Sequence, residues 1–382
     1  MDKGVAAGGA GCSGLGSCSC GSDTALLVDA FDASRVPGWV SGTVRTPVGV
    51  APLVKTTLSR SDVIGSWKAR WGIGRMSYRV TPGLYGVGAP DEDSPVLVSA
   101  NYKMSFDRLR RALAGIDAWI LVLDTKGINV WCAAGKGTFG TREIVERLAR
   151  FRISDVVRHR MLILPQLGAP GVEAHEVKKQ AGFRVVYGPV RADDLPVFIA
   201  AHGKATPAMR TVRFDLIDRL VLTPMELVAA IKPALILLAC LFLVKLIGSP
   251  RDPFLTLLIG ALRGFLPFLG AVVMGSIAAP ALLPYVPVRA FAWKGWLLGL
   301  FWAVFFVFFA SFPMRWEVGL FYLLVLPPIS GYLAMNFTGA STYTSLSGVV
   351  REMKTALPAL IVSAGLGMVS LIGGLITRAF LG

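Results

Sequence analysis

Charged residues are scarce in this chain of 382 residues, since only 16% are Asp, Glu, Lys or Arg whereas 54% are hydrophobic. A soluble domain usually has about 25% charged residues, so the composition excludes a simple soluble enzyme. The scarcity is concentrated after residue 220, where only 10 basic and 4 acidic residues occur. The first 220 residues hold the other 29 basic and 20 acidic ones. We therefore expect a water-soluble head, residues 24–220, and a membrane part, residues 221–382.

The start of the chain lacks a secretory signal, because no apolar run of about 7–15 residues follows the first basic residue. We therefore expect the head to lie on the cytoplasmic side. The spread of the five cysteines allows no disulfide framework. Three of them, Cys12, Cys18 and Cys20, belong to a Gly- and Ser-rich tail, residues 1–23, that we expect to be disordered. The Cys-x-Cys pair there is either a site for a thiophilic metal ion or two incidental thiols.

Hydrophobic periodicity divides the head into two parts. From Val36 to Ala100, short β-branched and aromatic runs broken by Gly and Pro indicate strands and turns. Beyond Ala100, strand and helix patterns alternate, which predicts a parallel, helix-flanked, Rossmann-like α/β sheet. The expected helices are 107–114, 141–150, 172–180 and 193–201, and the expected strands are 119–124, 161–164 and 183–187. Ligands of such sheets bind beyond the carboxyl ends of the strands, where we place a loop from Asp124 to Cys132.

The membrane part contains five apolar stretches of spanning length, which predict an all-α polytopic domain. They are residues 227–247, 255–283, 293–311, 318–336 and 357–380. With the head inside, seven basic residues lie before the first span or in the cytoplasmic connections: Arg210, Arg213, Arg219, Arg289, Lys294, Arg351 and Lys354. This positive-inside distribution predicts a multi-pass protein of the cytoplasmic (inner) membrane.

Two further features of the membrane part have competing interpretations. The segment from Asn336 to Thr355 is rich in Ser, Thr and Gly and is expected on the side of the head, either as a loop that docks on the head or as a solvated connection. Lys232, Lys245 and Arg263 either mark an ion path or extend to the membrane interface. The other spans have few ionisable residues, which disfavours transport.

The segment from Asn129 to Gly140, NVWCAAGKGTFG, is the most informative part of the chain. Its thiol, Cys132, is flanked by small residues that leave room for a large flat group beside the backbone. Cys132 is a small buried hydrophobe, a nucleophile or a soft metal ligand. A cysteine hydrolase needs a histidine base, and none of the three histidines, His159, His175 and His202, has a recognisable partner motif. The phosphate-binding motif GxxxxGK[ST] is absent.

The sequence NVWCAAGKGTFGT resembles the signature of the corrinoid membrane protein of microbial mercury methylation. Other segments that resemble this family are TPVGVAPLVKTTLSRSDVIGSWKARWGIGRMSYRV, NYKMSFDRLR, VVYGPVRADDLPVF and NFTGASTYTSLSGVVREM. The head is also similar to the corrinoid-binding part of the corrinoid iron-sulfur protein of the acetyl-CoA pathway. That protein lacks a cysteine at the position of Cys132. The Cys-rich tail lies outside both resemblances.

The resemblance implies that Cys132 is both catalytic and the lower axial ligand of the cobalt in base-off cobalamin. It further implies a cofactor-binding cap at the start of the following helix, formed by Asn129, Val130, Trp131, Cys132, Ala133, Ala134, Gly135 and Lys136. Lys136 either pairs with a polar group of the corrinoid or is solvated, and Trp131 packs either on the corrin edge or in the core. A thiolate is a soft, electron-rich donor, which is consistent with methyl transfer to a soft metal ion.

The implied activity is that of a membrane-anchored corrinoid methyltransferase, which passes a methyl group from methyl-Co(III) cobalamin to Hg(II) and yields methylmercury. The implied partners are a ferredoxin-like iron-sulfur protein as electron donor and a methyltetrahydrofolate-type methyl donor, together with membrane lipid and no nucleic acid. One alternative is a corrinoid methyl carrier for another acceptor in one-carbon metabolism. The other is a membrane corrinoid-binding protein without catalytic activity.

Overall fold

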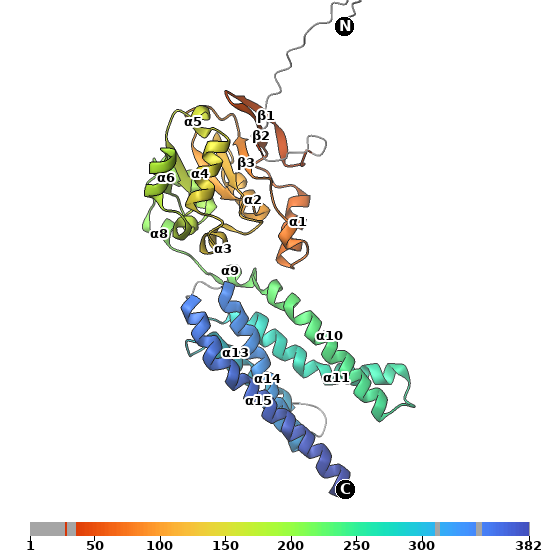
Figure 1. Cartoon of the computed structure of the whole chain (residues 1–382). Helices are drawn as coiled ribbons and strands as arrows, with labels where there is room; N and C mark the ends of the chain where they lie inside the picture. The colour runs from red at the N-terminus through yellow and green to blue at the C-terminus, as the bar shows by residue number, and fades with distance from the viewer. Residues whose placement is uncertain (1–26, 29–35, 310–313, 341–345, 382) are drawn as a thin grey trace, which may run out of the picture.

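The computed structural model describes residues 27–28, 36–309, 314–340 and 346–381. An α/β body lies above a group of long helices (Figure 1). The expected tail with Cys12, Cys18 and Cys20 lies outside the described residues. The strands are β1 (Val40–Thr46), β2 (Gly49–Val54), β3 (Gly83–Val87), β4 (Val96–Ala100), β5 (Ala118–Leu123), β6 (Met161–Leu164) and β7 (Arg184–Tyr187).

The head is built on one seven-stranded sheet with the order β1-β2-β3-β5-β4-β6-β7. The strands β4, β5, β6 and β7 are parallel to one another. Two pairs are antiparallel, namely β3 with β5 and β1 with β2. The strands predicted beyond Ala100 are therefore parallel, as expected, but the sheet as a whole is mixed and not parallel throughout. A parallel connection needs a crossover of about a dozen residues or more, and the short link between Val87 and Val96 cannot supply one.

Helices cover both faces of this sheet. They are α1 (Arg60–Arg70), α2 (Lys103–Ala112), α3 (Val130–Gly135), α4 (Thr141–Arg150), α5 (Ile153–Val156), α6 (Ala174–Ala181), α7 (Leu195–Ala200) and α8 (Pro207–Arg210), with 3₁₀ turns η2 (Arg75–Ser77), η3 (Gln166–Gly171) and η4 (Ala192–Asp194). Alternate residues of β5 enter two different cores, because successive side chains of a strand point to opposite faces. Leu121 packs with Ala133 and Ile144 on the α3 and α4 side, whereas Ile120 packs with Phe106 on the α2 side.

Helix α1 corrects the expectation that residues 36–100 contain only strands and turns. Ser59 caps the helix, because its side chain accepts a hydrogen bond from the Asp62 amide at 3.2 Å while an Asp62 carboxylate oxygen accepts one from the Ser59 amide at 2.9 Å. This reciprocal pair is a capping box, which supplies partners to backbone donors that a helix start leaves unpaired. The β-branched and aromatic residues of α1 resemble a strand pattern, but the capping pair Ser59 and Asp62 is the signal of a helix.

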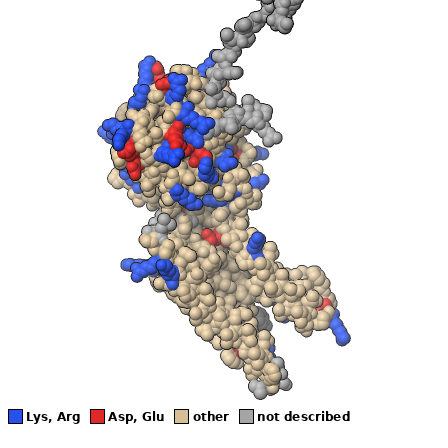
Figure 2. Space-filling model, viewed as in Figure 1, with Lys and Arg blue, Asp and Glu red and all other residues tan. Residues whose placement is uncertain are grey.

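Five helices in the described part of the chain are long and apolar enough to cross a membrane. The helices of this part are α9 (Leu216–Leu220), α10 (Thr223–Gly248), α11 (Phe254–Val273), α12 (Ala279–Ala281), α13 (Phe291–Phe309), α14 (Trp316–Asn336) and α15 (Leu346–Leu381), with a π-helical turn, η5 (Met274–Ala278), and a 3₁₀ turn, η6 (Phe337–Ala340). The surface of these helices is almost free of charge in Figure 2. The chain is thus compatible with a multi-pass membrane protein.

Small residues bring the long helices together. A Cβ atom added at Gly299 of α13 would lie 2.6 Å from the hydroxyl oxygen of Ser330 in α14, so the two backbones approach closely. The Ser330 hydroxyl in turn donates a hydrogen bond of 2.7 Å to the carbonyl of Ala271 in α11. Close backbone contact and buried interhelical hydrogen bonds are the usual means by which helices associate in membranes. Lys232, Lys245 and Arg263 are exposed on the outside of their helices, as expected for side chains that extend to the interface.

Specific contacts join the head to the long helices. The Arg219 guanidinium, which is buried, donates to the carbonyl of Ala281 at 2.9 Å. An ion pair of 2.5 Å links Arg191, in the loop after β7, to Asp218 in α9. Helix α9 therefore lies between the two parts and is held by both.

Candidate functional site

The carboxyl ends of β4 and β5 meet at one edge of the sheet, and a buried asparagine connects them. The side-chain oxygen of Asn101, which follows β4, accepts hydrogen bonds from the Thr125 hydroxyl at 2.8 Å and the Gly127 amide at 2.9 Å. Its amide group donates to Asp124 at 3.1 Å. Gly127 has a φ of 74°, a left-handed conformation that glycine adopts without a steric penalty. Asn101 therefore fixes the turn that leads from β5 to the candidate site.

The carboxylate of Asp124 stabilises the same turn. It accepts a hydrogen bond from the Lys126 backbone amide at 3.1 Å and forms a 2.5 Å ion pair with the Lys126 ammonium. Partial burial raises the pKa of the Asp124 carboxyl, but the hydrogen bonds from Lys126 outweigh that effect and the net pKa lies below its ordinary value. Asp124 is thus held as an anion that orders the turn before Asn129.

Cys132 lies on a short helix, α3, and not in a loop that runs from Asp124 to Cys132. The loop ends at Asn129, whose side chain accepts a hydrogen bond of 2.9 Å from the Cys132 amide and so caps the helix. Asparagine is among the residues that most favour this position, because its oxygen satisfies an otherwise unpaired amide. The thiol of Cys132 is free and exposed, which is inconsistent with a small buried hydrophobe.

The two faces of α3 separate the eight residues of the expected cap. Residues three or four apart lie on the same side of a helix. The inner face is formed by Val130, Ala133 and Ala134, which are at most 9% exposed and belong to the core of the head. The outer face carries Trp131, Cys132, Gly135 and Lys136, all exposed, while the half-buried Asn129 is the cap itself. Three side chains of the expected cap, those of Trp131, Cys132 and Lys136, are therefore available to a ligand, and Gly135 exposes its backbone.

The inner face of α3 is held tightly against the loop after β6. A Cβ atom added at Gly171 would overlap with the carbonyl of Phe139 and would lie 2.9 Å from the Cα atom of Ala134. A Cβ at Gly168 would likewise collide with the Phe139 ring. Sequence reasoning did not identify Gly168, Gly171 or Asn101 as contributors. Asn101 could have been identified from the sequence, because it is a polar residue directly after a buried strand. The carboxyl ends of such strands are where ligands of these sheets bind.

The space in front of α3 suits a large flat group that binds one protein donor. Within the described part of the chain, no heavy atom outside the local backbone lies within 4 Å of a Cβ atom placed at Gly135 or Gly137. The same residues contain no group of three or more metal-ligating side chains, so a multidentate protein site is not indicated. A corrin ring supplies most of the ligands of its cobalt itself, so the protein would have to offer one donor at most. The exposed Cys132 and the open surface around it fit that requirement.

The geometry disfavours a cysteine nucleophile activated by His159. This histidine precedes β6, and its Nε2 atom lies 2.9 Å from the carbonyl oxygen of Ser94, which precedes β4. Both residues are at the amino ends of parallel strands, whereas α3 follows the carboxyl end of β5. His159 therefore lies at the opposite edge of the sheet from Cys132.

The segment from Asn336 to Thr355 differs from the expected loop. Phe337–Ala340 form a 3₁₀ turn, and the chain is helical again from Leu346, so half of the segment belongs to α15. Residues 341–345 lie outside the described part.

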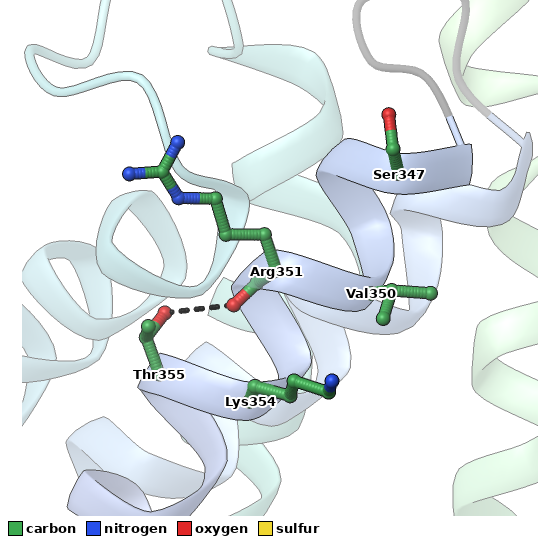
Figure 3. Close-up of a pocket in the computed structure, with 5 residues that line it drawn as sticks. All are labelled: Ser347, Val350, Arg351, Lys354 and Thr355. Carbon is green, nitrogen blue, oxygen red and sulfur yellow. Dashed lines mark hydrogen bonds between the residues drawn. The ribbon is translucent and has the colours of Figure 1, made fainter.

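The first turns of α15 border an open hollow of about 610 Å³ (Figure 3). It is lined by Ser347, Val350, Arg351, Lys354 and Thr355. In Figure 3, Arg351 extends to one side of the helix and Lys354 to the other, so the two basic groups do not converge. Cys132 does not line the hollow, and this region gives no support to an active site completed by the segment.

Comparison with known proteins identifies relatives of the region around Cys132. The family model described as CO dehydrogenase/acetyl-CoA synthase delta subunit matches residues 72–199. Among curated proteins, the acetyl-CoA decarbonylase/synthase complex subunit gamma of Methanopyrus kandleri is 35% identical over 131 residues, which cover 34% of this chain and 28% of the relative. The corresponding subunit of Archaeoglobus fulgidus is 30% identical over 118 residues, which cover 30% and 25% of the two chains.

The matched region includes the turn after β5, all of α3 and the strands that position them. The chain thus spans about a quarter of the length of these curated relatives. The helices that follow residue 199 lie outside the matched family model. The comparisons confirm the expected similarity of the head to proteins of acetyl-CoA metabolism.

Proposed function

We propose that the chain is a membrane-attached corrinoid protein that carries a methyl group in one-carbon metabolism, with Cys132 as the axial thiolate ligand of the cobalt. The observation that carries this proposal is the exposed thiol on the outer face of α3, at the ligand-binding edge of the sheet. The similarity of residues 72–199 to a subunit family of CO dehydrogenase/acetyl-CoA synthase supports it, because this region contains α3. When bound, the corrinoid supplies a cobalt atom that can accept and release a methyl group.

Residues of this chain would perform three tasks in that role. Asn129 holds the amide of Cys132, so the thiol projects from a capped and therefore defined helix start. The exposed position of Cys132 allows its proton to leave to solvent when the thiolate binds a metal, since coordination requires deprotonation. Gly135 and Gly137 keep the outer surface open, so a macrocycle can lie close to the backbone.

Lys136 and Trp131 would contact the edges of such a macrocycle. Both are exposed on the same outer surface as Cys132, and Trp131 retains 39% of its accessible surface. The ammonium of Lys136 can donate hydrogen bonds to amide oxygens at the rim of a corrinoid, and the indole of Trp131 can pack on its apolar edge. By contrast, Ala133 and Ala134 act through the core, because they seat α3 on the sheet.

A second candidate function has Hg(II) as the methyl acceptor. The observation that favours it is the thiol at position 132 within NVWCAAGKGTFGT, a sequence that resembles the signature of mercury-methylating corrinoid proteins. A soft, electron-rich axial donor assists transfer to a soft cation. A membrane corrinoid-binding protein without turnover is the remaining alternative, and it predicts cofactor binding with no transfer to any acceptor.

Both catalytic proposals require other components. Electrons for the reduction of cobalt would come from a separate ferredoxin-like iron-sulfur protein, and the methyl group from a methyltetrahydrofolate-type donor. The curated relatives are named as subunits of a complex, which supports a role for protein partners. Orientation of the head toward the cytoplasm would place it beside these soluble components.

The proposed ligation is tested by the absorption spectrum of the full chain in detergent after reconstitution with cobalamin. We expect the wild-type spectrum to show thiolate ligation and the spectrum of Cys132→Ala to lose it. Identical spectra for the two proteins would overturn the assignment of Cys132.

The acceptor is tested separately, on protein that has passed the spectral test. The methylated full chain is mixed either with Hg(II) or with the acetyl-CoA synthase protein of a one-carbon pathway, and loss of the methyl group is followed in a single turnover. Rapid loss to one acceptor selects between the two functions, and retention of the methyl group with both supports the non-catalytic alternative.

A further inference from the structure

Helix α1 presents an apolar surface that the proposed methyl transfer does not use. Trp67 retains 63% of its accessible surface, Ile64 retains 55%, and Ile73, just beyond the helix, retains 63%. A hollow of about 300 Å³ on this surface is lined by Val63, Ile64, Trp67, Lys68, Trp71 and Ile73. Contiguous exposed apolar side chains of this size usually mark a surface that contacts a protein or a membrane.

The opposite side of α1 is fixed to the head by a buried ionic cluster. Asp62 accepts hydrogen bonds from the Lys103 ammonium at 2.7 Å and from the Arg110 guanidinium at 2.8 Å. Asp107 completes the cluster with bonds to the same two cations. Tyr78 packs against Gly65 in the middle of the helix, and its hydroxyl donates to the Asp62 carbonyl at 3.1 Å. The apolar face is therefore held outward in one orientation.

The end of α1 lies beside the start of the first long apolar helix. A Cβ atom added at Gly72 would lie 3.7 Å from the Cγ1 atom of Val228 in α10. Val228 belongs to the apolar helix that is long enough to cross a membrane. Figure 1 shows α1 at the base of the head, directly above the beginning of α10. The exposed face of α1 is thus at the level where α10 would enter the bilayer.

The charges around this face are basic. Between residues 60 and 79 the chain has five basic residues, Arg60, Lys68, Arg70, Arg75 and Arg79, and one acidic residue, Asp62. Since the Asp62 side chain is buried in the ionic cluster, the charges that this segment presents to its surroundings are positive. Figure 2 shows basic side chains along the lower rim of the head, above the long helices, on which charged side chains are few. Exposed tryptophan beside Lys and Arg is typical of a segment that lies at a membrane–water interface.

We propose that α1 is an interfacial helix, which places Trp67, Trp71 and Ile73 among the lipid headgroups of the leaflet on the side of the head. Anionic phospholipids are the preferred occupants, because a positive segment near the surface is attracted by their charge. The contact of α1 with α10 makes this surface continuous with the membrane-crossing helices. Docking through α1 would also fix the height of α3 above the bilayer, because both helices lie at the base of the head (Figure 1).

The experiment uses the full chain in lipid nanodiscs, with the photoreactive residue p-benzoylphenylalanine at position 67 or 71. Position 161 is the matched control, because Met161 is 37% exposed and Trp71 is 39% exposed. Met161 begins β6 and therefore lies at the sheet edge opposite α3. The nanodiscs contain phosphatidylcholine alone or a mixture with phosphatidylglycerol, and lipid adducts are measured by mass spectrometry after irradiation.

We expect several-fold more lipid adduct at positions 67 and 71 than at 161, and a further increase when phosphatidylglycerol is present. Lys68→Glu should remove that increase. Equal yields at the three positions would overturn the proposal, as would cross-links from position 67 to protein in place of lipid. Equal yields in the two lipid compositions would overturn the preference for anionic lipid. Positions 67 and 71 are tested separately, so that the result does not depend on one variant that fails to fold. Both replacements put an aromatic residue in the place of an exposed tryptophan.

Discussion

Helices α1 and α3 both lie at the base of the head, but they are held in different ways and present different surfaces. Helix α3 has six residues and is seated by small side chains that allow close backbone contact, as at Ala134 and Gly171. Helix α1 has eleven residues and is attached by an ionic cluster around Asp62 and by contacts with Tyr78. The outer face of α3 offers a thiol among small residues, whereas that of α1 offers large apolar side chains. The comparison indicates that the outer face of α3 suits a flat cofactor bound close to the backbone. The outer face of α1 suits membrane lipid, which can adapt its shape to large apolar side chains.

The largest effect is expected at the thiol. Cys132→Ala should abolish methyl transfer, because it removes the proposed axial ligand, while the protein remains folded and in the membrane. The exposure of the Cys132 side chain supports the expectation that the variant stays folded, since removal of the thiol creates no cavity in the core. Cys132→His should retain little activity, because imidazole is a harder and weaker donor. Methyl transfer is measured per folded protein in the membrane fraction, and wild-type activity of the alanine variant would refute the role of Cys132.

The second-largest effect is expected at the open surface beside the Cys132 thiol. Gly135→Leu should prevent cobalamin binding by steric overlap yet leave the fold intact, because its added side chain would point into open space. Gly42→Leu, at another glycine with open space in β1, is the control and should bind cobalamin normally. Ala134→Leu is less informative, because Ala134 is only 5% exposed and overfilling the core costs about 1–3 kcal/mol by itself. Cobalamin retention after gel filtration is the measurement, and unchanged retention by Gly135→Leu would exclude close contact at this position.

The attachment of α1 should be lost when its central carboxylate is removed. Asp62→Ala removes one of the two carboxylates that pair with the buried cations Lys103 and Arg110 and leaves Asp107 to both of them. Removal of one partner from a buried ionic group costs up to about 3–5 kcal/mol. Asp193→Ala removes an exposed pair with Arg111 and should cost about 0–1 kcal/mol. Denaturation of the full chain in detergent compares the two variants. Similar losses of stability would show that the cluster does not hold α1.

The same carboxylate predicts a dependence on pH. Burial raises the pKa of Asp62, but hydrogen bonds from Lys103 and Ser59 outweigh this effect and the net pKa lies well below its ordinary value. A carboxyl group with a lowered pKa stabilises the fold above its unfolded value of about 3.9, and this contribution is lost as the pH falls toward the folded value. The difference in stability between wild type and Asp62→Ala should therefore be constant near neutral pH and shrink below about pH 4.

A smaller effect is expected at the turn before α3. Asn101→Ala removes the acceptor of the Gly127 amide and one of the two acceptors of the Thr125 amide, and an unsatisfied buried group costs about 1–3 kcal/mol. Hydrogen exchange should increase in residues 124–135 and remain unchanged in α1. Increased hydrogen exchange in both residues 124–135 and α1 would show that the contacts that hold α3 also stabilise α1.

Several features follow from local sequence alone. Long apolar runs predicted the five helices of spanning length, because a helix must satisfy its own backbone and exceed the bilayer thickness. The periodic pattern of residues 141–150 and the run 161–164 predicted α4 and β6 with their observed bounds. Cys132 was identified as a candidate because it is a thiol flanked by small residues, whereas its role as a cobalt ligand was implied only by the resemblance of NVWCAAGKGTFGT to a corrinoid family.

Only the tertiary structure decided the direction of β3, the orientation of α1 on the head and the division of the cap into inner and outer faces. Strand direction depends on the partner across the sheet, and β3 pairs with β5, which is distant in sequence. The orientation of α1 depends on Lys103 and Arg110, whose contacts with Asp62 cannot be read from local periodicity. The exposure of Cys132 and the burial of Ala134 depend on where the Gly168–Gly171 loop packs. Each of these is a long-range interaction, and a local pattern contains no information about its partner.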